Sequence, residues 1–309
     1  MLLTLMQKFV FEDLDEYAKC TQENDVFNKN KTLQPTHHVG LCNSPSKGGC
    51  QPHGSEVPMC YKVAFRPSKD IRILDTELMV ATYIFGQDFE NSDILVDSPH
   101  CNGSREAFKT LVPGSGIIDD VLILVAEMMT NRQDNHKWFL PPGFAQIAIQ
   151  LINVSSGTLS FKRQRYMPKF ERLEKFLMII DLVEHELVYL DSLKSNEEKP
   201  SRVQAMKDVA CFLGGLIDNE LIYDNPMPIS KNELAEPKIC QQKKDTLDCG
   251  IWVSQWITMS NVWDAQDLEE VNEYSRMRLA IDLVLNDYNP KREEIVRTAM
   301  NAWNIKSKA

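Results

Sequence analysis

Apolar residues recur every three or four positions in several stretches of the chain, as they do on one face of an α-helix. The spacing predicts a helix that begins at Asp119-Asp120 and another that begins at Pro200-Ser201 and ends at Gly214-Gly215. Two further amphipathic helices are expected over residues 264–286 and 291–303. Helices are therefore predicted on both sides of the middle of the chain.

Between these helices lie two short runs of aliphatic and aromatic residues, Phe176-Leu-Met-Ile-Ile180 and Leu187-Val-Tyr-Leu190. Residues of these types favour β-strands, and the polar pair Glu184-His185 between the runs is placed as the turn of a hairpin. Helices, then a hairpin, then more helices indicate an α+β fold with a small central sheet flanked by helices.

Residues 1–62 show no sustained period of 2 or 3.6, and they are rich in Asn, Lys, Ser, Gly, Pro and His. We predict a mostly disordered N-terminal segment there and a folded domain from about residue 63. Zinc-binding residue types do occur in the segment, at His37, His38, Cys42, Cys50, His53 and Cys60. Their gaps match none of the compact Cys/His pairs of zinc sites, so a flexible tail is the favoured interpretation.

Charge and apolar content exclude several classes of protein. The 309 residues carry 34 Lys plus Arg against 44 Asp plus Glu, a formal charge of −10, which argues against a protein that tracks nucleic-acid phosphates. No apolar run approaches the roughly 18–20 residues that span a bilayer, and no secretion signal is recognised at the start. We therefore expect the eight cysteines to be thiols or metal ligands in a reducing compartment, not disulfides.

Two residues stand where cysteine chemistry would need them. Cys249 heads a predicted helix after a polar stretch, and the partial positive charge of a helix N-terminus favours a thiolate. Asp191 ends an apolar strand, where a carboxylate that orients an imidazole could sit. Taken singly, Cys249 could equally be an ordinary buried cysteine, and Asp191 could equally be an ordinary aspartate at the end of a strand.

Taken together, three segments resemble the ubiquitin-like protease family, the papain-like cysteine peptidases that process SUMO and related modifiers. They are Phe176-Leu-Met-Ile-Ile-Asp-Leu, Tyr189-Leu-Asp191-Ser-Leu, and Gln241-Gln242 followed by Asp248-Cys249-Gly250. The resemblance continues upstream through Ser104-Arg105 and Asp119-Asp120 and covers residues 75–305 approximately. It implies a papain-like cysteine peptidase fold over residues 63–305, with a helical half at about 70–160 and a catalytic core at about 161–305.

Carried over by position, the resemblance implies Cys249 as the nucleophile, Asp191 as the residue that orients the catalytic His, and Gln242 or Gln241 as the oxyanion donor. The choice between the glutamines stays open, because the loop from Gln242 to Cys249 is one residue longer than is usual in the family. The resemblance implies no cofactor and no metal. It implies SUMO or another ubiquitin-like protein and its conjugates as partners, without nucleic acid or membrane, and an intracellular location that favours the nucleus over the cytoplasm.

One departure from the family pattern bears directly on activity. The family has a His-Trp pair seventeen positions before the Asp, where this chain has Glu174-Lys175. An ionised Glu174 neither accepts the thiol proton well nor returns one to the leaving amine. His185 in the turn and His136 in a polar loop are not placed to replace the imidazole. Ile117 likewise stands where the family has a tunnel Trp.

The departure leaves two functions in competition. The first is a thiol peptidase or isopeptidase that cleaves after Gly-Gly, severely impaired here. The second is an inactive pseudopeptidase that still binds a ubiquitin-like protein. Because the charged stretch 163–175 runs straight into Phe176, we also hypothesise that a short segment is absent from the transcript or gene model. Sequencing reads of the transcript that run without a break across codons 174–176 would contradict this hypothesis.

Overall fold

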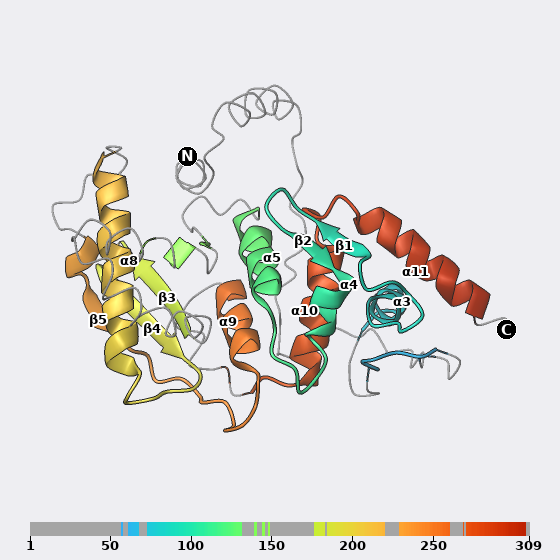
Figure 1. Cartoon of the computed structure of the whole chain (residues 1–309), viewed down its shortest axis with the longest axis horizontal. Helices are drawn as coiled ribbons and strands as arrows, with labels where there is room; N and C mark the ends of the chain where they lie inside the picture. The colour runs from blue at the N-terminus through green and yellow to red at the C-terminus, as the bar shows by residue number, and fades with distance from the viewer. Residues whose placement is uncertain are drawn as a thin grey trace, which may run out of the picture. The chain divides into compact units, whose positions relative to one another are not determined.

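The computed structural model describes residues 57, 61–67, 73–131, 139–140, 144–145, 148, 176–182, 184–219, 229–259, 268 and 270–306, all within one compact unit, Gly40–Ala309. Its helices, drawn in Figure 1, are α3 (Asp75–Ile84), α4 (Arg105–Lys109), α5 (Asp119–Thr130), α8 (Lys199–Asn219), α9 (Cys249–Thr258), α10 (Glu273–Leu285) and α11 (Arg292–Lys306). Its strands are β1 (Ile94–Asp97), β2 (Asn102–Ser104), β3 (Phe176–Asp181), β4 (Glu186–Asp191) and β5 (Glu233–Ala235). The predicted α+β class is confirmed.

The predicted hairpin is confirmed as β3 and β4, which pair antiparallel from Phe176 opposite Asp191 to Asp181 opposite Glu186. His185 lies in the turn with a left-handed backbone (φ 57°), as the sequence predicts for that position. Strand β5 adds to the other side of β4 in parallel, which completes a three-stranded sheet in the order β3-β4-β5.

Helix α9 packs on one face of this sheet. Val188 and Leu190 of β4 share a buried cluster with Trp252 and Trp256 of α9. Because side chains alternate between the faces of a strand, Asp191 belongs to the opposite face from Leu190. The carboxylate that ends β4 is therefore on the α8 side of the sheet.

The larger core joins α3, α5 and α10 to the β1-β2 hairpin (Figure 1). Its fully buried residues include Val80, Ile84, Leu95, Phe108, Leu124, Met128, Leu279 and Leu283. Arg105, also fully buried, donates hydrogen bonds to the carbonyls of Tyr83, Ile84 and Glu90, so its charge lies within a cage of oxygen acceptors.

Packed residues occur on both sides of the predicted boundary near residue 62. Val57 and Tyr61 are buried against Leu78 of α3. The Tyr61 hydroxyl donates to the carbonyl of Ala302 at 2.8 Å, and its ring stacks on Trp303 of α11. The boundary itself stays a prediction, and the candidate zinc-binding histidines and cysteines between His37 and Cys60 lie outside the described residues.

Two predicted helix ends are wrong. Helix α8 runs through Gly214-Gly215 to Asn219, because a glycine inside a helix costs only about 1 kcal/mol relative to alanine and does not by itself end it. Helix α10 begins at Glu273, not at residue 264, with the Asn272 side chain accepting a capping bond from the Ser275 N–H at 3.2 Å. The helix that begins at Asp119 is confirmed.

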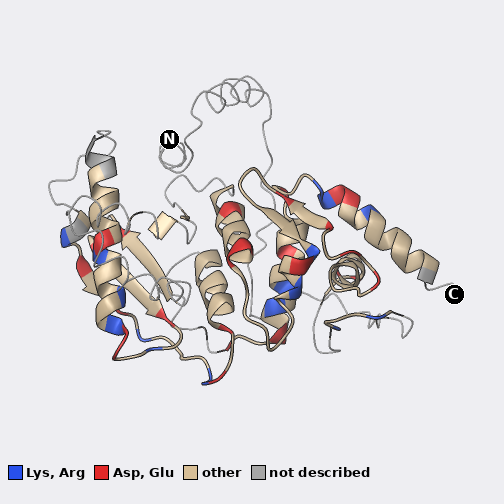
Figure 2. Cartoon of the chain, in the orientation of Figure 1, with Lys and Arg blue, Asp and Glu red and all other residues tan. Residues whose placement is uncertain are grey.

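Helices α8, α10 and α11 each carry both acidic and basic side chains (Figure 2). Two of their arginines, Arg202 of α8 and Arg276 of α10, are almost completely buried. Over the described part of the chain, none of the helices combines the length and apolar character needed to cross a membrane.

Candidate active site

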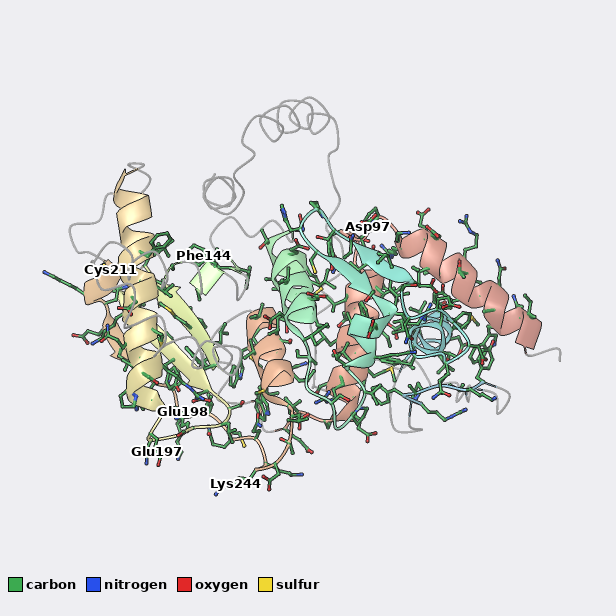
Figure 3. The ribbon with its side chains drawn as sticks, viewed as in Figure 1. Asp97, Phe144, Glu197, Glu198, Cys211 and Lys244 are labelled. Carbon is green, nitrogen blue, oxygen red and sulfur yellow. The ribbon has the colours of Figure 1, made fainter. Side chains whose placement is uncertain are left out.

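Cys249 is the first residue of α9, so its thiol lies at the helix end where backbone N–H groups point outward. The residue is partly exposed, and its sulfur is a thiol, not part of a disulfide. The other described cysteines are Cys101, Cys211 and Cys240, of which Cys211 lies on the outside of α8 (Figure 3). Among these four, only Cys249 combines partial exposure with the start of a helix.

Asp248, which precedes the cysteine, is fixed by an arginine from a different helix. The Arg276 guanidinium donates from Nε and Nη2 to Asp248 Oδ1, at 3.1 and 2.6 Å. Arg276 is 2% exposed, whereas the Asp248 side chain is 24% exposed. The segment that leads into α9 is thereby held against the first turn of α10.

The two candidate oxyanion donors lie against the end of β4. The backbone N–H of Gln242 donates to the carbonyl of Ser192 at 2.9 Å, and its side-chain Oε1 accepts from the Ser192 hydroxyl, also at 2.9 Å. Its Nε2 donates to the Thr246 carbonyl, three residues before Cys249. The buried Gln242 amide therefore spans from the strand end to the loop that leads to the nucleophile.

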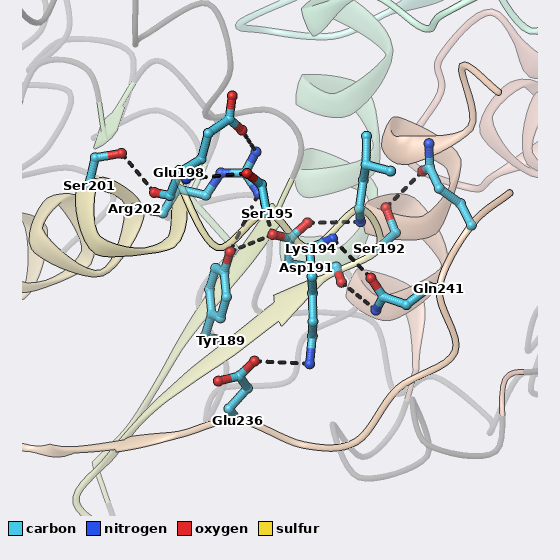
Figure 4. Close-up of polar contacts among 12 residues, drawn as sticks. Tyr189, Asp191, Ser192, Lys194, Ser195, Glu198, Ser201, Arg202, Glu236 and Gln241 are labelled. Atoms are coloured by element: carbon cyan, nitrogen blue, oxygen red, sulfur yellow. Dashed lines mark hydrogen bonds and ion pairs between the residues drawn. The ribbon is translucent and has the colours of Figure 1, made fainter. Parts of the chain in front are cut away.

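Gln241 is used differently. Its Nε2 donates to the Asp191 carbonyl and its Oε1 accepts from the Lys194 N–H, both at 2.9 Å. Both ends of this side-chain amide are thus bonded to backbone beyond β4 (Figure 4). Gln241 fastens the loop to the sheet.

A cavity of about 290 Å³ lies beside the start of α9. Its lining includes Pro113, Gln242, Asp248, Trp252, Asn272 and Arg276. The cavity thus brings together the loop before α5, the glutamine segment, the first turns of α9 and the start of α10. Both Gln241 and Gln242 reach it, along with the residue immediately before Cys249.

Ile117 lies directly on the first turn of α9. A Cβ atom added to Gly250 would fall 2.3 Å from Ile117 Cγ1 and 2.6 Å from its Cδ1. Since such distances are far inside van der Waals contact, only glycine at position 250 lets Ile117 approach so closely. Ile117 therefore lies at the Cys249 end of α9.

Asp191 is fully buried, and its carboxylate is occupied (Figure 4). Oδ2 accepts from an Arg202 N–H of α8 and from the Tyr189 hydroxyl, while Oδ1 accepts from the Leu193 N–H at 2.9 Å. Glu198 pairs with the other end of the Arg202 guanidinium. Every oxygen of Asp191 thus has a partner that is not an imidazole.

The environment of this network favours a neutral Tyr189 and a charged Arg202 beside Asp191. Burial, strengthened by the hydrogen bond to Asp191, raises the pKa of Tyr189 well above its usual value. Burial alone would lower the pKa of Arg202, but the bond with Tyr189 and the charge of Asp191 outweigh that effect and the pKa is raised. Asp191 therefore faces a permanent cation.

The structure brings Gln241, Gln242 and the backbone of Asp191 together, and it places Gln242 beside the approach to Cys249. Glu174, Lys175 and His136 lie outside the described residues. His185 lies six positions along the chain from Asp191, or about 20 Å at 3.3 Å per strand residue. The other described histidine, His100, neighbours Glu127 of α5.

Sequence reasoning missed both buried arginines, although the sequence carries a signal for them. Arg202 lies four residues before Met206, on the apolar stripe of α8, and Arg276 lies three and seven residues before Leu279 and Leu283 of α10. A charged side chain on an apolar helix face is buried only when a group of opposite charge or a hydrogen-bond acceptor pairs with it. A carboxylate near each arginine could therefore have been predicted.

No protein-family model matches this chain, and no curated protein matches it. Solved structures are similar in chain path. One, described as SUMO protease Ulp1 with its catalytic cysteine oxidised to a sulfonic acid, is 16% identical, with 70% of this chain and 98% of that one covered and a TM-score of 0.49.

Two further structures show a similar likeness. The C-terminal Ulp1 protease domain in complex with Smt3, the yeast ortholog of SUMO, is 16% identical over 70% of this chain and 97% of that one, with a TM-score of 0.46. The Ulp1-like SUMO protease catalytic domain of Chaetomium thermophilum is 13% identical over 74% and 97%, with a TM-score of 0.39.

Proposed function

We propose that this chain is a domain of the ubiquitin-like protease type that binds the C-terminal tail of SUMO or a similar modifier beside Cys249, with its peptidase turnover severely impaired. The observation that carries the proposal is that the buried Asp191 carboxylate accepts hydrogen bonds from Arg202, Tyr189 and the Leu193 N–H, in a chain whose residue 174 is Glu. The motifs around Cys249 supply the family resemblance on which the proposal builds.

Impairment follows from what a cysteine peptidase needs. A general base takes the thiol proton, and the same group then protonates the departing amine. Asp191 in the peptidase role would hold an imidazole in place, but here it neutralises Arg202. Loss of general acid–base assistance slows such a reaction by about 10²- to 10⁴-fold.

Binding does not depend on that proton transfer. The cavity beside α9 is lined by Gln242, Trp252 and the residue before Cys249, which supplies amide and indole surface for an extended peptide. Within this proposal Gln242 is the oxyanion donor, because its Nε2 lies against the loop that leads to Cys249, whereas the Gln241 amide is bonded to backbone at and just after the end of β4. The expected partners are a ubiquitin-like modifier and its conjugates, in a nuclear setting.

One experiment separates binding from turnover. The full chain is mixed with each of a panel of ubiquitin-like proteins, once with a native Gly-Gly terminus to measure noncovalent affinity and once with a C-terminal electrophile to measure Cys249 adducts. We expect saturable binding of at least one modifier, slow adduct formation that Cys249→Ser abolishes and Cys240→Ser leaves unchanged, and a larger loss of adduct with Gln242→Ala than with Gln241→Ala.

Two outcomes would contradict the proposal. Rapid multiple-turnover cleavage of a modifier fusion by the unaltered chain would show that the site is not impaired. Failure of every modifier in the panel to bind would remove the docking role. Glu174→His alone is expected to leave turnover low, since Asp191 stays paired with Arg202; full activity from that single change would show that Arg202 is no obstacle.

A further inference from the structure

Arg276 holds two segments together at the start of α9. Besides the two bonds to Asp248, its Nη2 donates to the Leu247 carbonyl at 3.1 Å and its Nη1 to the Val112 carbonyl at 3.3 Å. Val112 belongs to the segment that leads into α5, and Leu247 to the segment that leads into α9. One buried guanidinium therefore joins the segment that leads into α5 to the segment that leads into α9, and Arg276 also lines the cavity beside the start of α9.

The charge of Arg276 acts on Cys249 through Asp248. A carboxylate on the residue next to a cysteine disfavours the thiolate and opposes the effect of the helix N-terminus. With Arg276 bonded to Asp248 Oδ1, the pair is neutral, and the positive end of α9 is left to act on the thiol. The same contact that positions the loop thus removes an unfavourable charge.

We propose that Arg276 is a positioning residue for Cys249: it fixes the segments leading into α9 and α5 and neutralises Asp248, so that the thiol at the helix start ionises readily. The inference rests on the proposed function in taking Cys249 as the reactive group of the site. The test of this inference uses a small alkylating reagent and no modifier protein. The inference and the proposed function can therefore fail separately.

The experiment measures the pH dependence of Cys249 alkylation by iodoacetamide in the folded full chain, with the Cys249 and Cys240 peptides quantified by mass spectrometry. Exposed Cys240 serves as the internal reference. The variants are Arg276→Met, Arg276→Lys, Asp248→Asn and Arg276→Met/Asp248→Asn. Arg278→Met is the matched control, because Arg278 is a second well-buried arginine of α10 that pairs with Glu77 and Asp282 instead of Asp248.

The expected shifts have opposite signs. The midpoint is the pH at which the Cys249 alkylation rate reaches half its maximum. Arg276→Met leaves the Asp248 charge uncompensated, so we expect it to raise this midpoint by about one pH unit and to slow alkylation roughly tenfold near pH 7. Asp248→Asn lowers the midpoint, the double variant returns it toward the parent value, and Arg276→Lys stays near the parent because it keeps the cation. Arg278→Met leaves the Cys249 midpoint unchanged although it also removes buried ion pairs.

Equal Cys249 midpoints in Arg276→Met and Arg278→Met would overturn the inference, as would an upward shift in Asp248→Asn. If Arg276→Met does not fold, the near-isosteric Asp248→Asn still decides the matter by the sign of its shift, and a Cys249 midpoint in Arg276→Lys far from that of the parent chain would contradict the inference. Midpoint shifts as expected in a chain that binds no modifier would leave the inference standing and the proposed function refuted; modifier binding with no shifts would do the reverse.

Discussion

Two buried arginine–aspartate pairs flank the candidate site, and they have opposite consequences for it. Arg202 and Asp191 lie on the α8 face of the sheet, where both side chains are almost fully enclosed. Arg276 and Asp248 lie at the start of α9, where only the arginine is enclosed. The first pair occupies the carboxylate that a catalytic imidazole would need, whereas the second fixes the loop beside the thiol.

An ion pair that involves a buried arginine therefore has no fixed functional meaning. Each arginine satisfies a carboxylate that the family resemblance or the chain order places near the chemistry. What matters is what the carboxylate would otherwise do: Asp191 would orient a base, while Asp248 would suppress a thiolate. Under the proposed function, pairing therefore removes a role at Asp191 and protects the thiol beside Asp248.

The largest effect is expected from breaking the enclosed pair. Arg202→Met should lower the free energy of unfolding by about 3–5 kcal/mol, because it leaves the Asp191 charge buried without its cation. Denaturant titration at pH 7 measures the change. Arg202→Met/Asp191→Asn should recover most of the loss, and the control Lys199→Met, which removes a partly exposed pair with Glu236, should cost less than about 1 kcal/mol. A loss in Arg202→Met no larger than in the control would abolish the distinction between the pairs.

A smaller loss is expected at the start of α9. Arg276→Met should cost about 2–3 kcal/mol in the same titration, since it removes hydrogen bonds to a carboxylate that still reaches solvent. Asp248→Asn, which keeps an oxygen acceptor for the guanidinium, should cost less. If both variants were as destabilising as Arg202→Met, the exposure of Asp248 would not matter and the comparison would need revision.

The packing of Ile117 on Gly250 is an uncharged contact at the first turn of α9, next to Cys249, and its energetic effect can be compared with that of the two ion pairs. Gly250→Ala should destabilise the chain by about 1–3 kcal/mol, since the new Cβ overlaps Ile117. A double-mutant cycle with Ile117→Ala measures the overlap directly: the alanine at 250 should cost much less once the isoleucine is shortened. Additive losses would place the strain somewhere other than this contact.

The smallest effect concerns Cys101, a partly buried thiol with two acidic residues nearby. Burial, with Asp120 and Glu127 adding to it, raises the pKa of Cys101 to about 11. The folded state therefore holds the proton longer than the unfolded chain, and stability should fall modestly as the pH rises from about 9 to about 11. Cys101→Ala should remove this part of the pH dependence, and Cys101 should be alkylated more slowly than Cys249 at pH 8.

The sequence carried much of the local structure. Two continuous apolar runs on either side of Glu184-His185 specify the hairpin, since few other arrangements bury both runs. The polar loop before Cys249 and the tryptophans one turn apart after it specify a helix that starts at the cysteine. The helix end predicted at Gly214-Gly215 was wrong because a glycine pair weakens a helix without ending it, and because α8 packs against residues Ile229–Lys231, which lie further along the chain.

Only the tertiary structure decided how the charges pair. Asp191 and Arg202 come from a strand and a helix, and Asp248 and Arg276 from two different helix starts, so local spacing could not match them. The direction of the Asp191 carboxylate depends on which face of β4 packs on α9, and that choice is made by Val188 and Leu190 against the α9 tryptophans. The sequence thus determined that a hairpin forms and that a cysteine heads a later helix. The packing of distant elements determined which arginine neutralises which carboxylate, because electrostatic partners are selected by proximity in space and not along the chain.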